Sequence, residues 1–338
     1  MIAETSQGLF CEAGGFYVDP WQPVKRAVIT HAHADHARPG SEAYLCAPEC
    51  APLLRRRLQD GSIEIQPWGQ PITIGDVRVS LHPAGHILGS AQVRIEHHGD
   101  VWVVSGDYKR AADPTCLPFE PVKCNTFITE ATFGLPIYTW DPSAVVIAEI
   151  MEWWRANRTQ DRASVLFCYV LGKAQRILAE LRDVADEPIR LHGAMAALTD
   201  LYRDAGVALA PTERIAEDMR GRALAGSLVL APLSARGTPW MRRLPNPSMA
   251  FASGLMRVRG VRRQRAFDRG FVLSDHADWR ALLDTIHETG ASRVLVTHGW
   301  SDALARFLSE RGLETGTLRT AFEGEIGELT AADAETSA

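Results

Sequence analysis

Short apolar segments separated by turns dominate the first part of the chain. Residues 26–31, RAVITH, form an apolar run that ends in a histidine, and residues 71–85 and 90–107 alternate apolar with polar side chains. A period of two predicts half-buried strands, and HHGD at 97–100 predicts a hairpin turn. Residues 47–59 have helical spacing instead. The pattern predicts a β-rich region with one short helix.

The periodicity changes from residue 141. A helix is predicted over 141–158, with Asp141 as its cap and a proline after it. Apolar strand patterns then alternate with helical ones, which is typical of βα units in a parallel sheet. The predicted strands are 164–170, 188–192, 226–233 and 248–254, followed by a strand and loop at 269–278, a helix at 279–289, a strand at 292–299, a helix at 301–311 and a last strand near 313–319.

Composition places the chain among soluble globular proteins. Its 338 residues suffice for one large domain or two ordinary ones, with 46% hydrophobic and 23% charged residues. The first ten residues lack the features of a signal peptide, and no apolar run is long enough to span a bilayer. The six cysteines contain no CxxC motif, which predicts free thiols in a reducing cytoplasm. We therefore expect a cytoplasmic protein with no membrane contact.

Positive charge is concentrated in one segment. The whole chain has a net charge of −5, but residues 220–270 contain eleven arginines and one acid, a net charge of +10. Arginine forks suit phosphate groups, so this segment favours a nucleic-acid-binding face, although a solvated arginine-rich surface is the alternative.

Three histidines and an aspartate follow the first apolar run, in HAHADH at 31–36. Strand residues two apart point to one side, so His31 and His33 can converge, and a turn brings Asp35 and His36 to the same space. Imidazole nitrogen together with carboxylate oxygen suits zinc, manganese or iron, and the lack of sulfur favours a catalytic site. The pattern predicts a metal site.

Further donors are expected at other strand ends, because four ligands are too few for two ions. Three positions share the context of an apolar strand, a small residue and a ligand-type side chain. These are His86 in HPAGH, Asp107 in VVSGD and His298 in VLVTH.

Together, these motifs resemble those of the metallo-β-lactamase fold, an αββα sandwich with a binuclear metal site. The resemblance implies two divalent ions, zinc or manganese, and an early aspartate, Asp19, that orients a ligand histidine. The implied ligands are His31, His33 and His86 for one ion, Asp35, His36 and His298 for the other, and Asp107 as the bridge.

The long βα region between FITEATFG at 127–134 and LSDHAD at 273–278 resembles the insertion of the β-CASP nucleases of this fold. In length and motifs the chain is most similar to the bacterial DNA-ligase-associated exonuclease family, which implies functional links to an ATP-dependent DNA ligase and a helicase. The implied domains are a metallo-β-lactamase domain at 1–137 and 270–330, a parallel α/β insertion at 138–269 and a disordered tail at 331–338.

The resemblance implies a nuclease that activates a hydroxide with two metal ions. Its catalytic residues would be Asp35, His276 as a proton donor or phosphate ligand, and Glu130 as the partner of His276. Asp278, by contrast, is expected to cap the following helix. Lys173 is either a phosphate contact or a surface lysine, and the other candidate substrate contacts are Ser234, Arg236, Ser253 and Arg257.

The nature of the substrate is open at this stage. The whole-chain resemblance favours single-stranded DNA, whereas a histidine at the position of His298 is typical of RNA-processing members. Artemis-like DNA nucleases usually have an aliphatic residue there. A small-ester or thioester hydrolase and a non-catalytic nucleic-acid scaffold are further alternatives. The long arginine-rich insertion disfavours the hydrolase, and the full ligand set disfavours the scaffold.

Overall fold

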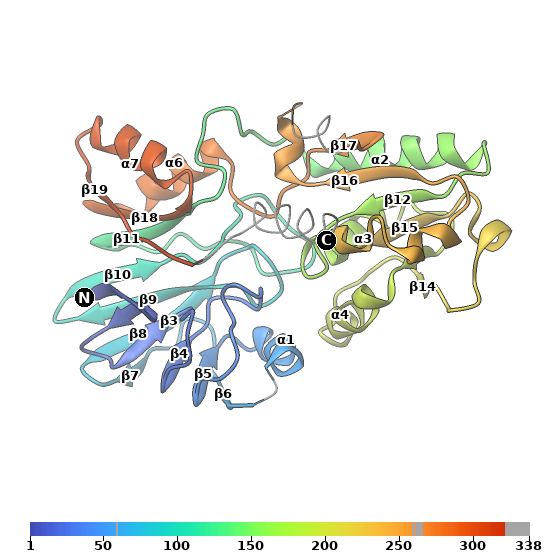
Figure 1. Ribbon diagram of the computed structural model, residues 1–338. Helices are drawn as coiled ribbons and strands as arrows, with labels where there is room; N and C mark the ends of the chain where they lie inside the picture. Colours follow the sequence, from blue (N-terminus) through green and yellow to red (C-terminus); the bar gives the residue numbers. More distant parts are fainter. Residues whose placement is uncertain (59, 259, 261–265, 322–338) are drawn as a thin grey trace. The chain divides into compact units, whose positions relative to one another are not determined.

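A computed structural model describes residues 1–58, 60–258, 260 and 266–321 (Figure 1). It is a mixed α/β structure, as the sequence predicts, and its described strands form three sheets. The chain divides into two compact units. Unit 1 comprises Met1–Thr139 and the described residues from His276 onward, and unit 2 comprises Trp140–Asp275. The division into two units does not test the domain borders that we expect from the sequence, at 137/138 and 269/270, and these borders stay a prediction.

The first sheet of unit 1 has six strands in sequence order. Neighbouring strands are antiparallel from β1 to β3 and parallel from β3 to β6, and helix α1 (Cys50–Arg57) packs beside β6. The strands are β1 (Ile2–Thr5), β2 (Gly8–Cys11), β3 (Phe16–Val18), β4 (Arg26–Val28), β5 (Ala43–Cys46) and β6 (Ser62–Ile65).

The second sheet of unit 1 has seven strands. Strands β7 to β10 are antiparallel neighbours, and β10, β11, β18 and β19 are parallel neighbours. Helices α6 (Trp279–Thr289) and α7 (Ser301–Ser309) contact this parallel half. The order is β19 (Glu314–Thr317), β18 (Arg293–Gly299), β11 (Thr126–Ala131), β10 (Asp100–Val104), β9 (Ala91–His97), β8 (Val77–Pro83) and β7 (Ile72–Ile74).

The sheet of unit 2 is parallel throughout, as its βα pattern predicts. Strand β17 pairs with β16 in this sheet, although we expected residues from 270 onward to belong to the first domain. The order is β14 (Thr212–Arg214), β13 (Ile189–Leu191), β15 (Leu228–Ala231), β12 (Ser164–Phe167), β16 (Ser248–Ala252) and β17 (Arg269–Phe271).

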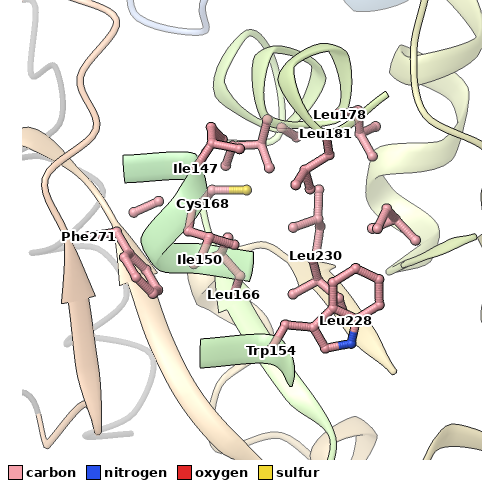
Figure 2. Close-up of a cluster of buried hydrophobic side chains, with 14 of the residues drawn as sticks. Ile147, Ile150, Trp154, Leu166, Cys168, Leu178, Leu181, Leu228, Leu230 and Phe271 are labelled. Atoms are coloured by element: carbon pink, nitrogen blue, oxygen red, sulfur yellow. The ribbon is translucent and has the colours of Figure 1, made fainter. Parts of the chain in front are cut away.

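Three helices of unit 2 pack on one face of this sheet. They are α2 (Ser143–Arg158), α3 (Lys173–Leu181) and α4 (Gly193–Asp204). Figure 2 shows their apolar side chains meeting Leu166, Leu228 and Leu230 of the sheet. Trp154 is fully buried there and its indole donates to the Gly226 carbonyl at 2.8 Å, so this side chain has a packing role.

Two expectations about helix ends have different outcomes. Asp278 does cap α6, because its carboxylate accepts a hydrogen bond from the Ala281 amide at 2.8 Å. Asp141 does not cap α2. Pro142 occupies the capping position and no side chain bonds the first turn there, because the helix begins one residue later than expected.

The sequence predicts cysteines without disulfides and no segment that spans a bilayer. None of the six cysteines takes part in a disulfide, and four of them are buried. Among the residues that the structure describes, no helix is both long and apolar enough to cross a bilayer. The predicted tail at 331–338 lies outside the described residues.

Candidate metal centre

The predicted donors all belong to unit 1 and follow or end strands of its two sheets. The two sheets meet here, since the Ala91 amide of β9 bonds the Thr30 carbonyl after β4 at 2.8 Å. The donors are His31, His33, Asp35 and His36 after β4, His86 after β8, Asp107 after β10 and His298 near the end of β18.

Four of these residues converge on one point. Nδ1 of His33 lies 3.1 Å from Nε2 of His31 and 3.2 Å from Nε2 of His86. The carboxylate Oδ2 of Asp107 lies 3.6 Å from Nε2 of His31 and 3.8 Å from Nε2 of His86. All four side chains are buried, and their donor atoms lie within 4.8 Å of one another.

This donor set fits a single divalent ion. Zinc–nitrogen bonds of about 2.0–2.1 Å in tetrahedral geometry place neighbouring nitrogens about 3.3 Å apart. The spacing around His33 is close to that value. Burial lowers the pKa of His31 well below its usual range, and the nearby His36 and His33 lower it further. His31 is therefore neutral, which is the state that metal ligation requires.

The second carboxylate oxygen of Asp107 faces His298, while the first also lies near His36. Oδ1 lies 3.1 Å from Nε2 of His298, whereas Oδ2 lies 3.5 Å from Nε2 of His36. Asp35 lies 3.9 Å from His36 and is the most exposed donor, with 18% of its side chain accessible. A carboxylate with donors on both oxygens has the arrangement of a bridging ligand.

Asp19 and Thr30 fix the orientation of two of the histidines. Asp19 accepts bonds from the Thr30 amide at 2.8 Å, the Thr30 hydroxyl at 2.5 Å and Nδ1 of His36 at 2.8 Å. Because the Thr30 hydroxyl donates its proton to Asp19, it accepts from Nδ1 of His31 at 3.0 Å. In both histidines, Nε2 is left with its lone pair for a metal.

Thr297 does the same for His298. Its hydroxyl donates to the Thr129 carbonyl at 3.2 Å and therefore accepts from Nδ1 of His298 at 3.0 Å. Sequence reasoning missed both threonines. The signal was present in the repeated Thr-His pairs at 30–31 and 297–298.

A glycine brings Asp107 close to these residues. Gly106 has a φ of +56°, and a Cβ there would lie only 2.6 Å from the Thr30 Cβ. A larger residue would have to push the loop after β10 away from the loop after β4. The SGD motif therefore needs its glycine for a close backbone approach.

His276 and Glu130 form a buried pair beside the donors. Nδ1 of His276 lies 2.9 Å from Oε2 of Glu130, and the other oxygen of Glu130 accepts from the Tyr108 amide at 2.7 Å. The ring of His276 lies 4.7 Å from that of His86, centroid to centroid. The Tyr108 carbonyl also accepts from the Ala277 amide at 2.7 Å. The backbone contribution of Tyr108 was not foreseen, because a main-chain donor leaves no mark in the sequence.

The charges of the centre are strongly coupled. Burial lowers the pKa of His36, but Asp107, Asp35 and Asp19 outweigh it and raise that pKa to about 10. Burial raises the pKa of Asp107, but His36, His276 and His298 outweigh this and hold it well below the usual range. The carboxylate is therefore ionised and attracts positive charge, which a divalent cation also supplies.

The candidate substrate contacts all lie in unit 2. Lys173 is not a surface residue, because only 1% of it is exposed and its Nζ lies 3.7 Å from Oδ2 of Asp275. Ser253 is also buried, and its hydroxyl accepts from the Leu255 amide at 3.1 Å as a helix cap. Ser234 is exposed on a short 3-10 helix, Leu233–Ala235.

Some of the described arginines of residues 220–270 contact other side chains of unit 2. Arg236 lies 4.5 Å from the ring centre of Phe267, and Arg257, which is exposed, lies 3.7 Å from Asp141. Four further arginines of the segment lie outside the described residues, namely Arg259, Arg262, Arg263 and Arg265.

Comparisons with known proteins agree with the motifs. The chain is 35% identical over 330 residues to a protein named probable DNA ligase from Opitutus terrae, a match over 95% of this chain and 31% of that protein. It is 32% identical to an endoribonuclease ysh1 from Aspergillus fumigatus over 31% of this chain and 12% of that protein. An RNase J-like protein from Methanocaldococcus jannaschii is 25% identical over 38% of this chain and 32% of its own length.

The chain thus spans about a third or less of the length of these relatives. No family profile matches it. A crystal structure of a protein of unknown function from Enterococcus faecalis shares the fold, with a TM-score of 0.59 and 14% identity over 87% of this chain and 79% of that one. These similarities are consistent with the resemblance of the motifs to the metallo-β-lactamase/β-CASP nuclease family.

Proposed function

We propose that this chain is a metal-dependent nuclease that cleaves phosphodiester bonds of single-stranded DNA, in a DNA-repair role. One observation carries the proposal. Asp107 is buried with histidine nitrogens near both of its carboxylate oxygens, and the His276–Glu130 pair lies beside them. Names of relatives, which include endoribonucleases and an RNase J-like protein, support hydrolytic nucleic-acid cleavage.

Two divalent ions, zinc or manganese, are the proposed cofactors. His31, His33 and His86 would hold one ion, Asp35, His36 and His298 the other, and Asp107 both. When bound, such a pair holds a phosphate oxygen and lowers the pKa of a water between the ions. Nitrogen and oxygen ligands accept either metal, so an experiment with added zinc or manganese has to decide between the two.

The protein's own contribution to catalysis is the handling of a proton by His276. Glu130 holds Nδ1 of His276 and favours the protonated ring, which leaves Nε2 to donate a proton to the leaving oxygen. The Tyr108 amide fixes the other oxygen of Glu130, so the carboxylate cannot rotate away. Asp35, the most exposed donor, is the ligand that an incoming phosphate meets most easily.

We propose the αββα metallo-β-lactamase sandwich for unit 1 and the β-CASP insertion for residues 138–269. The two sheets of unit 1 and the parallel sheet of unit 2 support this assignment. Ser234, Arg236, Ser253 and Arg257 stay proposed backbone contacts for the substrate. Lys173 is not proposed as one of these contacts, because it is buried with its Nζ beside Asp275.

DNA is favoured over RNA by the extent of the resemblance. The relative that matches 95% of this chain carries a DNA-ligase name, whereas the relatives with RNA-processing names match about a third of it. A functional link to an ATP-dependent DNA ligase and a helicase is proposed on the same ground. A protein of this kind would work in the cytoplasm.

Digestion of matched strands tests the proposal. Linear and circular single-stranded DNA and RNA of one sequence are incubated with metal-free protein and then with added zinc or manganese. We expect metal-dependent cleavage of linear DNA, and circles that survive would show a need for ends. No cleavage of any strand with either metal, by folded protein that binds both ions, would contradict the proposal.

An RNA nuclease with the same site is the second candidate. His298 favours it, because a histidine at this position is typical of RNA-processing members, and here it lies 3.1 Å from Asp107. Faster cleavage of the RNA strands than of the DNA strands in the same assay would select this candidate.

A further inference from the structure

Two cationic side chains of helix α3, Lys173 and Arg176, contact Asp275, the residue that precedes His276. Nη1 of Arg176 lies 3.1 Å from Oδ1 of Asp275 and donates to the Ser274 carbonyl at 2.6 Å. Nζ of Lys173 lies 3.7 Å from Oδ2 of Asp275. The side chains of Lys173, Arg176 and Asp275 are at most 5% exposed, so this cluster is shielded from water.

The cluster has a rigid base and balanced charge. Glu180 accepts from Nε of Arg176 at 3.1 Å, so two cations face two carboxylates. Leu178 and Leu181 of the same helix point into the apolar core of unit 2 (Figure 2). Because the helix is anchored by its apolar face, Lys173 and Arg176 have little freedom to follow a displaced Asp275.

The next residues along the chain are held by unit 1. His276 bonds Glu130 at 2.9 Å, and the Ala277 amide bonds the Tyr108 carbonyl at 2.7 Å. Adjacent Cα atoms are separated by only about 3.8 Å, so fixing residues 274 and 275 restricts the backbone of residue 276. Burying an ion pair removes two charges from water, and this cost offsets most of the stability that the pair provides. This favours a role of the Lys173/Arg176–Asp275 cluster in holding one conformation of the segment.

We propose that Asp275 is a positioning residue for His276, and that Lys173 and Arg176 hold it for that purpose. The inference rests on the proposed nuclease function, in which His276 gives a proton to the leaving oxygen. It assigns Lys173 to the alignment of the proton donor. Without the ion pair, Nδ1 of His276 is expected to lose its contact with Glu130.

The test compares Asp275→Asn and Lys173→Met with Lys173→Arg and with Asp186→Asn. Asp186 belongs to an ion pair of the same unit, at 3.0 Å from Arg158, but its side chain is 59% exposed and contacts none of the cluster. Turnover, KM and bound metal are measured for each variant, and wild type and His276→Ala are measured in parallel.

Asp275→Asn and Lys173→Met should lower kcat by about tenfold to a hundredfold, because a displacement of a catalytic group by about 1 Å is enough for such a loss. KM and metal content should stay near wild-type values, Lys173→Arg should keep most of the activity, and Asp186→Asn should equal wild type. A folded Asp275→Asn variant with wild-type kcat would overturn the proposal.

A crystal structure of Asp275→Asn supplies a readout that does not depend on activity. We expect Nδ1 of His276 to move out of hydrogen-bond range of Glu130, and an unmoved His276 would overturn the proposal. If Asp275→Asn does not fold, the charge-neutral double variant K173M/D275N is judged by the same two criteria. Equal turnover of wild type and His276→Ala would instead reject the proposed function, while the crystal structure still decides the positioning.

Discussion

Both units have an apolar core, and they differ in the polar side chains that they bury beside it. At the meeting point of its two sheets, unit 1 buries three histidines and an aspartate within 4.8 Å of one another. Unit 2 buries a continuous apolar face between its parallel sheet and three helices, and places its buried cations against carboxylates. Burying polar groups without compensation is costly, so the histidine cluster of unit 1 points to metal chemistry, whereas the buried cations of unit 2 are compensated by carboxylates.

The largest effect is expected from Asp107→Asn in unit 1. Both carboxylate oxygens face histidine donors, so we expect metal binding to fall and cleavage to drop by about a thousandfold or more. Asp100→Asn is the matched control, because Asp100 begins the strand that Asp107 follows, is exposed, and accepts a hydrogen bond from the Trp102 indole. Full activity of a metal-free Asp107→Asn preparation would break the comparison.

The next effect is expected from His276→Ala. Loss of a proton donor costs about a hundredfold to ten-thousandfold in rate, so kcat should fall by that amount with metal content unchanged. Glu130→Gln should cost less, because the amide still contacts Nδ1 of His276 while its charge is lost. Steady-state kinetics check both, and a greater loss for Glu130→Gln would contradict the assigned roles.

A smaller effect is expected from Asp19→Asn. Asp19 accepts hydrogen bonds from His36 and Thr30, so it acts through the ligands it orients. Removing such a partner typically weakens metal affinity by about tenfold to a hundredfold. Titration with a competing chelator measures the affinity, and unchanged affinity would show that the histidines keep their orientation without Asp19.

The smallest effect on the metal centre is expected from Trp154→Ala in unit 2. Its fully buried ring should cost about 3–5 kcal/mol of unfolding free energy, whereas Val145→Ala on the exposed side of the same helix should cost little. Chemical denaturation measures both. The metal content of the protein that remains folded should not change, and a loss of metal would sharpen the comparison by linking the two units.

The sequence predicted the residues of the site better than their supports. Spacing in HAHADH and the small residue before each later donor identified side chains that do converge. The Thr30 and Thr297 hydroxyls were missed because threonine is common in strands and its hydrogen-bond partner cannot be read from the sequence. The environment of Lys173 could not be predicted, because its partner Asp275 lies far along the chain and only the folded sheet brings them together.

Fold prediction succeeded where periodicity was long and failed at short elements. The βα alternation of unit 2 was clear, but β14 has only three residues and no apolar run, and was missed. Strand β17 pairs with β16 in the sheet of unit 2, and its three residues gave no indication in the sequence of which strand they would pair with.

Anomalous diffraction from crystals grown with zinc or manganese tests the central claim most directly. The account predicts two peaks on either side of the Asp107 carboxylate, one of them about 2.0–2.2 Å from Nε2 of His31, Nδ1 of His33 and Nε2 of His86. Crystals soaked with either metal in which no peak appears, and in which Asp107 or His298 turns away from the other donors, would contradict it.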